Sequence, residues 1–195
     1  MKVRHRLLLG LLLALVQLPL LATSASAASA GAAGGYQVEV VIFRALNSAA
    51  SEDLAVPAEG RGFGGQLDRG TAAPHLLRKL DASQMQLGGV AARLRSSGAY
   101  QVLAHAAWVQ TATDWPHHGA LGLEDLGITV PGLSGGFYLE RGPQLLHFGM
   151  ELHLGGSPSW SLSELRKVKF NDKNYFDHPG FGVIAIVSQA RHGEP

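Results

Sequence analysis

The sequence predicts an α+β fold, a single domain built from a mostly antiparallel sheet of about six strands and one main amphipathic helix. One group of apolar residues recurs at helical spacing, whereas most other apolar segments follow the two-residue period of strands. Gly makes up 25 of the 195 residues, well above the usual ~7%, which predicts many turns and long loops. We expect the domain to span residues 36–190, without an internal repeat.

The first half of this domain contains two strands and the helix. Residues 36–44 are rich in β-branched and aromatic side chains and are apolar on both faces, as in a central strand. Residues 45–73 have the composition of a long loop, and a short helix is expected at residues 75–80. The main helix is expected to start at a Ser83 cap and to end at Gly98. Its apolar stripe consists of Leu87, Val90, Ala91 and Leu94.

Residues 100–110 form the next predicted strand. A strand, a helix and a strand in this order predict a right-handed crossover, which makes the two strands parallel if they share a sheet. An irregular stretch follows at residues 111–131. The second half then continues with an antiparallel hairpin of residues 137–141 and 145–154, a strand with a charged outer face at 160–170, and an apolar central strand at 181–187.

The first thirty residues have the pattern of a secretory signal peptide. Lys2, Arg4 and Arg6 precede an apolar segment from Leu7 to Leu21, and small residues follow it. The apolar segment is shorter than the roughly 20 residues that span a bilayer. We therefore expect a signal peptide at residues 1–27, with cleavage as late as residue 30, and no stable membrane anchor afterwards. In a Gram-negative bacterium the mature chain would reside in the periplasm.

Composition excludes several classes of protein. The chain has no cysteine, which rules out disulfides and Cys-ligated metal sites and removes the acceptor for a bacterial lipid anchor. The net charge is +1, and the only basic cluster lies in the first six residues. Nucleic-acid binding depends strongly on neutralising phosphates. We therefore expect no nucleic-acid partner.

Two glycine-rich motifs resemble catalytic or phosphate-binding patterns without their setting. Residues 132–136 read Gly-Leu-Ser-Gly-Gly, but a nucleophile elbow needs a helix after its serine, and a hairpin is predicted there. Residues 60–65 lack both the strand-to-helix setting and the Lys-Ser/Thr ending of a phosphate loop.

His147, Glu151 and His153 share one face of a strand, but residues two apart lie roughly 7 Å apart, which disfavours a shared metal. No metal or other cofactor is expected.

Asp177 and His178 are the most suggestive polar pair. An Asp beside a His could form an acid–base pair, but the following Pro179 and Gly180 fit a type II turn in which Asp177 would bond to backbone amides. No nucleophile accompanies the pair. Large aromatic residues with polar neighbours suit a sugar or peptide ligand, although such residues are more often part of a core. The candidate ligand-binding residues are Trp115, His117, Trp160, Tyr175, Asp177 and His178.

Three blocks of sequence, residues 36–44, 100–110 and 175–184, together resemble the CsiV family. The hairpin with Tyr138-Leu139-Glu140-Arg141 and Leu145-Leu146-His147 fits the same pattern, so the resemblance spans nearly the whole mature chain. It implies a periplasmic, non-enzymatic peptidoglycan-binding protein that assists cell-wall synthesis, without catalytic residues. The chain has fewer basic residues ahead of the last block than the family pattern, and its Gly-rich loop at residues 48–70 departs from that pattern.

Two other functions stay open at this stage. The first is an adaptor that docks on a penicillin-binding protein or its lipoprotein activator, through an exposed strand edge and without contacting the wall. The second is an envelope hydrolase that uses Asp177 and His178, which the absence of a nucleophile disfavours.

Overall fold

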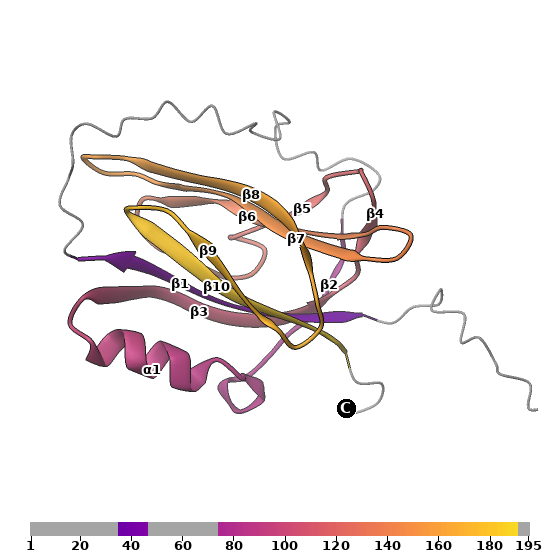
Figure 1. Ribbon diagram of the computed structural model, residues 1–195, viewed down its shortest axis with the longest axis horizontal. Coiled ribbons are helices and arrows are strands. Elements are labelled where there is room, and N and C mark those ends of the chain that lie inside the picture. Colours follow the sequence, from indigo (N-terminus) through magenta and orange to yellow (C-terminus); the bar gives the residue numbers. More distant parts are fainter. Residues whose placement is uncertain (1–34, 47–73, 191–195) are drawn as a thin grey trace, which may run out of the picture. The chain divides into compact units, whose positions relative to one another are not determined.

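The computed structural model describes residues 35–46 and 74–190 (Figure 1). These residues all belong to Gly31–Pro195, one of the two units into which the chain divides. The expected signal peptide, the Gly-rich loop at 48–70 and the motif at 60–65 lie outside the described residues. Within the described ranges no helix is both long enough and apolar enough to cross a bilayer.

Strands dominate the described part of the chain, which contains ten strands, one α-helix and one 3-10 helix. In order they are β1 (Tyr36–Ala45), β2 (Leu76–Lys79), η1 (Ala82–Gln84), α1 (Gly88–Ser96), β3 (Tyr100–Gln110), β4 (Thr113–Asp114), β5 (Ala120–Gly122), β6 (Leu133–Arg141), β7 (Leu146–Leu154), β8 (Trp160–Val168), β9 (Lys173–Asp177) and β10 (Phe181–Gln189).

The strands form two sheets. The first has the order β2-β3-β1-β10-β9, and all its neighbouring strands are antiparallel. The second has the order β4-β6-β7-β8, with β5 also paired to β6. Only the short β4–β6 pair is parallel among the strand pairs of the described ranges. The fold is therefore a largely antiparallel β-sandwich with a helix on one side.

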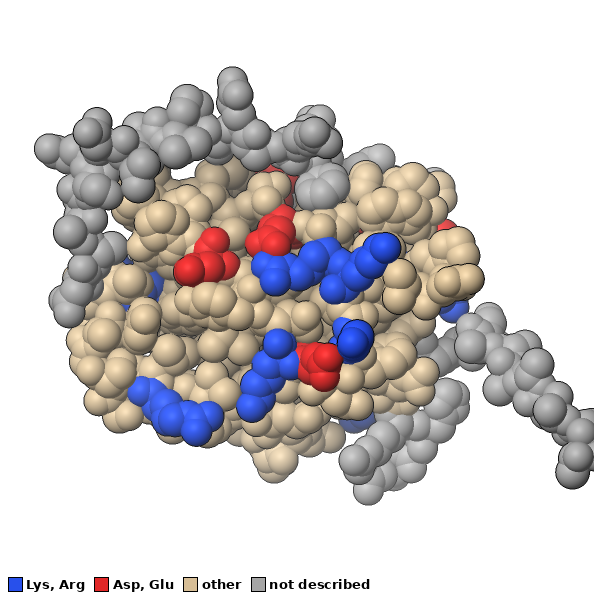
Figure 2. Space-filling model, viewed as in Figure 1, with Lys and Arg blue, Asp and Glu red and all other residues tan. Residues whose placement is uncertain are grey.

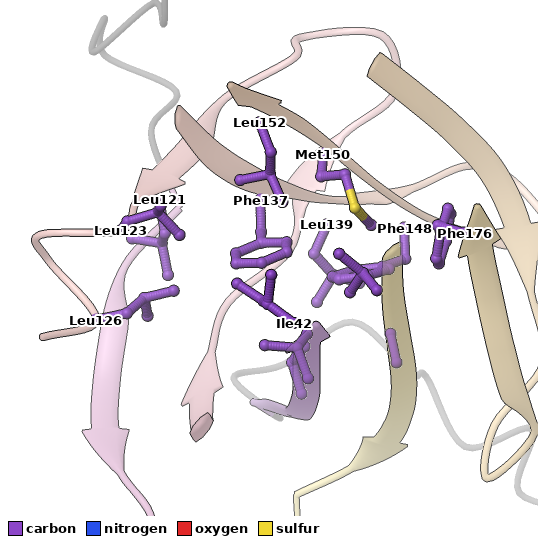
Figure 3. Close-up of a cluster of buried hydrophobic side chains, with 14 of the residues drawn as sticks. Ile42, Leu121, Leu123, Leu126, Phe137, Leu139, Phe148, Met150, Leu152 and Phe176 are labelled. Carbon is purple, nitrogen blue, oxygen red and sulfur yellow. The ribbon is translucent and has the colours of Figure 1, made fainter. Parts of the chain in front are cut away.

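The main core lies between the two sheets (Figure 3). Alternation along the strands turns every second side chain inward, so Val38, Val40 and Ile42 of β1 meet the apolar face of the second sheet. Aromatic contacts connect the layers, as Trp108 lies 5.5 Å from Phe137 between ring centroids. Further fully buried members are Leu139, Phe148, Met150, Leu152, Phe176, Val183, Ala185 and Val187.

Helix α1 covers part of the outer face of the first sheet. Leu87 and Ala91 pack against Val41 of β1 and Ile186 of β10 in a separate apolar cluster. Glu39, which also faces this side, is 1% exposed, and its carboxylate accepts hydrogen bonds from the backbone N–H groups of Gln86 and Leu87 at 2.6 and 2.7 Å. A strand residue thereby supplies the acceptor that the start of the helix needs.

The predicted fold class agrees with this architecture, because each of the six predicted strands corresponds to one of the six long strands. The four short strands β2, β4, β5 and β9 were not predicted, and the strands form two sheets rather than one. Three expectations are wrong. The main helix begins at Gly88 after an N-cap at Leu87 rather than at a Ser83 cap, because Ser83 lies within the separate 3-10 helix η1. β1 and β3 are antiparallel neighbours, so no crossover joins them, and the segment expected as a helix at 75–80 contains β2, which pairs with β3.

Candidate functional site

The six predicted ligand-binding residues lie in two places. Trp115 follows β4, and its backbone N–H donates to the carbonyl of Arg141 at the end of β6. Trp160 opens β8, opposite Leu154 at the far end of β7. Leu146 lies opposite Arg141 and eight positions before Leu154 in β7. At about 3.3 Å per residue, the two places are therefore roughly 26 Å apart along the strand.

Trp115 forms the wall of an open groove of about 440 Å³. Its indole is 42% exposed, which is high for so large an apolar ring. The ring stacks on the imidazole of His147 in β7, with centroids 4.3 Å apart and planes 27° from parallel. The rest of the groove is lined mainly by Pro143, Gln144, Leu145 and Lys167. The groove thus combines an apolar platform with amide and ammonium donors.

A contact between His118 and a buried carboxylate lies beside the groove and connects the segment that carries Trp115 to β6. Glu140 of β6 is fully buried, and its Oε1 lies 3.0 Å from Nδ1 of His118. His118 also contacts the edge of the Trp115 ring, with centroids 5.8 Å apart. A buried carboxylate is costly without a partner, so this pair favours one position of the 115–118 segment. His117 is exposed and does not line the groove.

His147 has an environment that favours its neutral form. Burial lowers its pKa below 6.5, and the positive charge of Lys167, its register partner on β8, lowers it further. The nearby Glu140 opposes these two effects only in part. The ring under Trp115 is therefore an uncharged, flat support at neutral pH.

The second place joins Trp160 to the turn between β9 and β10. His178 contacts the Trp160 ring edge-on, with centroids 5.3 Å apart. Burial lowers the pKa of His178, and the negative charge of Asp177 opposes this decrease in part. The predicted turn is present, since the His178 N–H donates to the carbonyl of Phe181. The type II conformation is wrong, because Gly180 does not have a positive φ. Its small size instead makes room for Trp160.

Tyr175 and Asp177 form a pair on the outer face of β9. The Tyr175 hydroxyl donates to Asp177 Oδ1 at 3.1 Å, and burial together with this hydrogen bond raises the pKa of Tyr175 to about 12. The expected hydrogen bonds from turn amides to Asp177 are thus replaced by one from a side chain. Tyr175 is 46% exposed and stacks on Phe43, which also contacts Tyr100. Tyr175 and Tyr100 are exposed at the two ends of this aromatic strip, whereas Phe43 between them is buried.

The arrangement of Asp177 and His178 does not resemble a hydrolytic centre. The hydrogen bonds that the structure gives their side chains go to Tyr175 and to the N–H of Gly180, respectively. Ser134 of the glycine-rich motif lies within β6, opposite His153, and a hairpin follows it as expected. Among the described residues, no three His, Asp or Glu side chains are grouped as a metal site would require.

Sequence reasoning missed a second groove, of about 680 Å³, on the outer side of the first sheet. Eight of its nine lining residues are polar, and they come from three strands, from the segment that contains η1, and from the turn after β8. The side chains are those of Gln37, Arg78, Ser83, Gln84, Gln86, Phe170, Asn171, Ser188 and Gln189. The sequence held one indication of this groove: alternation along β1 places Gln37 on the face opposite the buried Val38. The lining residues in the loops follow no pattern that would have predicted them.

On the face shown in Figure 2, acidic and basic side chains are interspersed and separated by uncharged surface. Such a distribution gives little long-range steering toward a polyanion. Recognition by this face would depend on short-range contacts.

Comparison with known proteins identifies a family. The family model described as "Peptidoglycan-binding protein, CsiV" matches residues 11–118, which include β1 to β4, the η1 side of the second groove, and Trp115. The match ends before Trp160 and the β9–β10 turn. No curated protein and no solved structure matches the chain. The match covers more than half of the sequence, and the chain belongs to the CsiV family.

Proposed function

We propose that the protein is a periplasmic, non-enzymatic peptidoglycan-binding protein that assists cell-wall synthesis, and that it holds the glycan strand in the Trp115 groove. The observation that carries this proposal is the exposed indole of Trp115, stacked on His147 beside polar groups. Trp115 is also the one predicted aromatic within the segment matched by the family model.

The chemistry of the groove suits a sugar. A pyranose ring has an apolar face of C–H groups that packs on an aromatic plane, while its hydroxyls and acetamido groups need hydrogen-bond partners around the rim. Besides His147 beneath the indole, the polar side chains that line the groove are those of Lys167 and Gln144. A groove this open would hold one disaccharide weakly. A polymer with many repeats compensates, because several weak contacts together give firm retention.

The export signal expected in the first thirty residues supports a periplasmic location, where such a polymer is found. The hydrogen bonds of Asp177 and His178, which join them to Tyr175 and to a backbone amide, support a role without catalysis. Binding without cleavage is what an assisting protein requires, since it would retain the wall near a synthase without degrading it.

An adaptor that docks on a penicillin-binding protein or its activator is the second candidate. The exposed rings of Tyr175 and Tyr100, which flank the buried Phe43 in this strip, favour it, because exposed aromatic residues are enriched at protein interfaces. In this case the strip, rather than the Trp115 groove, would make the functional contact.

One experiment separates these functions. Purified mature protein is incubated with isolated sacculi, and both the sedimented protein and the released muropeptides are measured. We expect sedimentation without release, and we expect Trp115→Ala to weaken binding to sacculi at least about fivefold, which corresponds to ~1 kcal/mol for the lost packing on the aromatic plane. Leu77→Ala, an exposed apolar residue 53% accessible and outside both grooves, is the matched control. Release of muropeptides would indicate a hydrolase, and absence of sedimentation would indicate the adaptor.

A further inference from the structure

The floor of the polar groove is a row of residues that crosses four strands of the first sheet. Arg78 of β2 lies opposite Val109 of β3, Val109 opposite Gln37 of β1, and Gln37 opposite Ser188 of β10. Paired residues in antiparallel strands point to the same face. The guanidinium, the amide and the hydroxyl therefore stand on one rigid surface that the backbone hydrogen bonds hold in place.

Two loops raise the walls of this groove. On one side are η1 and Gln86, whose backbone N–H is held by the buried carboxylate of Glu39. Gln84 is also fixed, because its Oε1 accepts a hydrogen bond from the Asp81 N–H at 3.2 Å. On the other side is the turn after β8, where Phe170 stacks on Tyr36 with planes 13° from parallel. The walls are thus prearranged before any ligand binds.

The chemistry of the lining is that of a peptide site. Primary amides can donate to a peptide carbonyl and accept from a peptide N–H, and the groove presents several of them. Arg78 is the one charged residue among the described residues that line it. A guanidinium without a lining carboxylate favours a ligand that brings its own carboxylate, which it can bind through two parallel hydrogen bonds. A volume of about 680 Å³ lies within the usual range for ligand sites.

We infer that this groove binds a short extended peptide by its amides and by its free terminal carboxylate, which Arg78 holds. The inference rests on the proposed function, because in peptidoglycan such a peptide is the stem peptide attached to the glycan. The two grooves would then divide the polymer between them, with the sugar at Trp115 and the peptide at Arg78. Val38 and Phe148 are buried between the sheets, so Gln37 and His147 face away from the core on opposite sides. The two grooves can therefore engage different strands of the wall.

Calorimetric titration with a synthetic stem pentapeptide of the Gram-negative wall, L-Ala–γ-D-Glu–meso-diaminopimelate–D-Ala–D-Ala, tests the inference. We expect the peptide to bind the full mature chain, and we expect the form with an amidated carboxyl terminus to bind about tenfold more weakly. Arg78→Gln should weaken binding of the free-acid peptide by a similar factor and remove the difference between the two forms. Arg95→Gln, an exposed arginine in the last turn of α1, is the matched control.

The outcomes separate this inference from the proposed function. If the pentapeptide does not bind, or if Arg78→Gln and Arg95→Gln bind it equally, the peptide site is wrong. Glycan strands stripped of their peptides provide the second probe. If Trp115→Ala abolishes binding of these strands and Arg78→Gln does not, the sugar site is supported independently of the peptide site. Peptide binding that survives Trp115→Ala supports the assignment of two separate sites.

Discussion

The indole of Trp115 lies on the imidazole of His147, with ring centroids 4.3 Å apart. The two residues are 32 positions apart in the sequence and come from a loop and a strand. The contact holds one face of the indole against the protein, while Trp115 as a whole is 42% exposed. An ordered ring loses less conformational freedom when a ligand stacks on it.

We therefore expect His147→Ala to weaken binding to sacculi about two- to tenfold, since an aromatic pair contributes ~0.5–1.5 kcal/mol. His147→Phe should restore most of the binding, because it retains a flat ring. His153→Ala is the control, as His153 is exposed on the same side of β7 and bonds to Ser161. Equal sedimentation of the His147→Ala and His153→Ala variants across a range of sacculus concentrations would show that the stack has no role in binding.

Glu39 should be essential for stability. Its carboxylate is buried and accepts from the N–H groups of Gln86 and Leu87, and its Oε1 lies 2.7 Å from His105 Nε2. Glu39→Ala leaves these donors without an acceptor, and we expect it to lower the free energy of unfolding by about 3 kcal/mol. Asp114→Ala, which removes an exposed pair with Arg141, should cost less than about 1 kcal/mol. Urea denaturation measures both values, and similar losses for the two variants would refute the prediction.

Two glycines should respond to alanine in opposite ways. A Cβ on Gly180 would lie 2.4 Å from the Trp160 indole, so we expect Gly180→Ala to destabilise the protein by about 1–3 kcal/mol. Gly89, inside α1, has no atom within 4 Å of the same position. Gly89→Ala should stabilise the protein by up to about 1 kcal/mol. Thermal denaturation distinguishes these signs, and a stable Gly180→Ala variant would show that Trp160 moves aside readily.

Stability should fall in mild acid. Burial lowers the pKa of both His147 and His178 below 6.5. Between pH 6.5 and the lower pKa values that these histidines have in the folded protein, the unfolded chain therefore binds more protons than the folded protein. The contribution of the two neutral histidines to the free energy of unfolding is complete above pH 6.5 and decreases as the pH falls below 6.5.

Urea denaturation at about pH 5.5 and pH 7.5 measures this dependence. The double variant His147→Gln, His178→Gln should show a smaller loss between the two values, because glutamine does not titrate in this range. Histidine ring resonances give an independent check by NMR. Midpoints above 6.5 for either residue would contradict the prediction.

The long elements were predictable because their patterns are local. In β7 the inward residues Phe148, Met150 and Leu152 alternate with outward ones, and this period alone defines a half-buried strand. Short strands such as β2 have too few residues for a period, and they form only because β3 offers an open edge. The predicted direction of β3 relative to β1 is wrong. The order strand, helix, strand does not by itself fix the direction of the second strand, and here β3 runs antiparallel to β1.

The candidate sites were likewise predictable only where a local pattern marks them. Trp115 could be chosen from the sequence as an aromatic residue among polar neighbours, but its support by His147 depends on a contact between distant segments. The polar groove was not predictable, because Arg78, Gln37 and Ser188 come into one row only through the pairing of four strands. Residue types alone do not reveal such a convergence.

The chain has three tryptophans, and their indole N–H resonances test the central claim directly. Trp108 is fully buried and donates to Gln110 at 2.6 Å, so its resonance serves as an internal reference. When glycan strands freed of peptides are added to ¹⁵N-labelled protein, we predict a saturable shift of the Trp115 indole resonance and an unchanged Trp108 resonance. An unperturbed Trp115 resonance at concentrations where the protein sediments with sacculi would contradict the account.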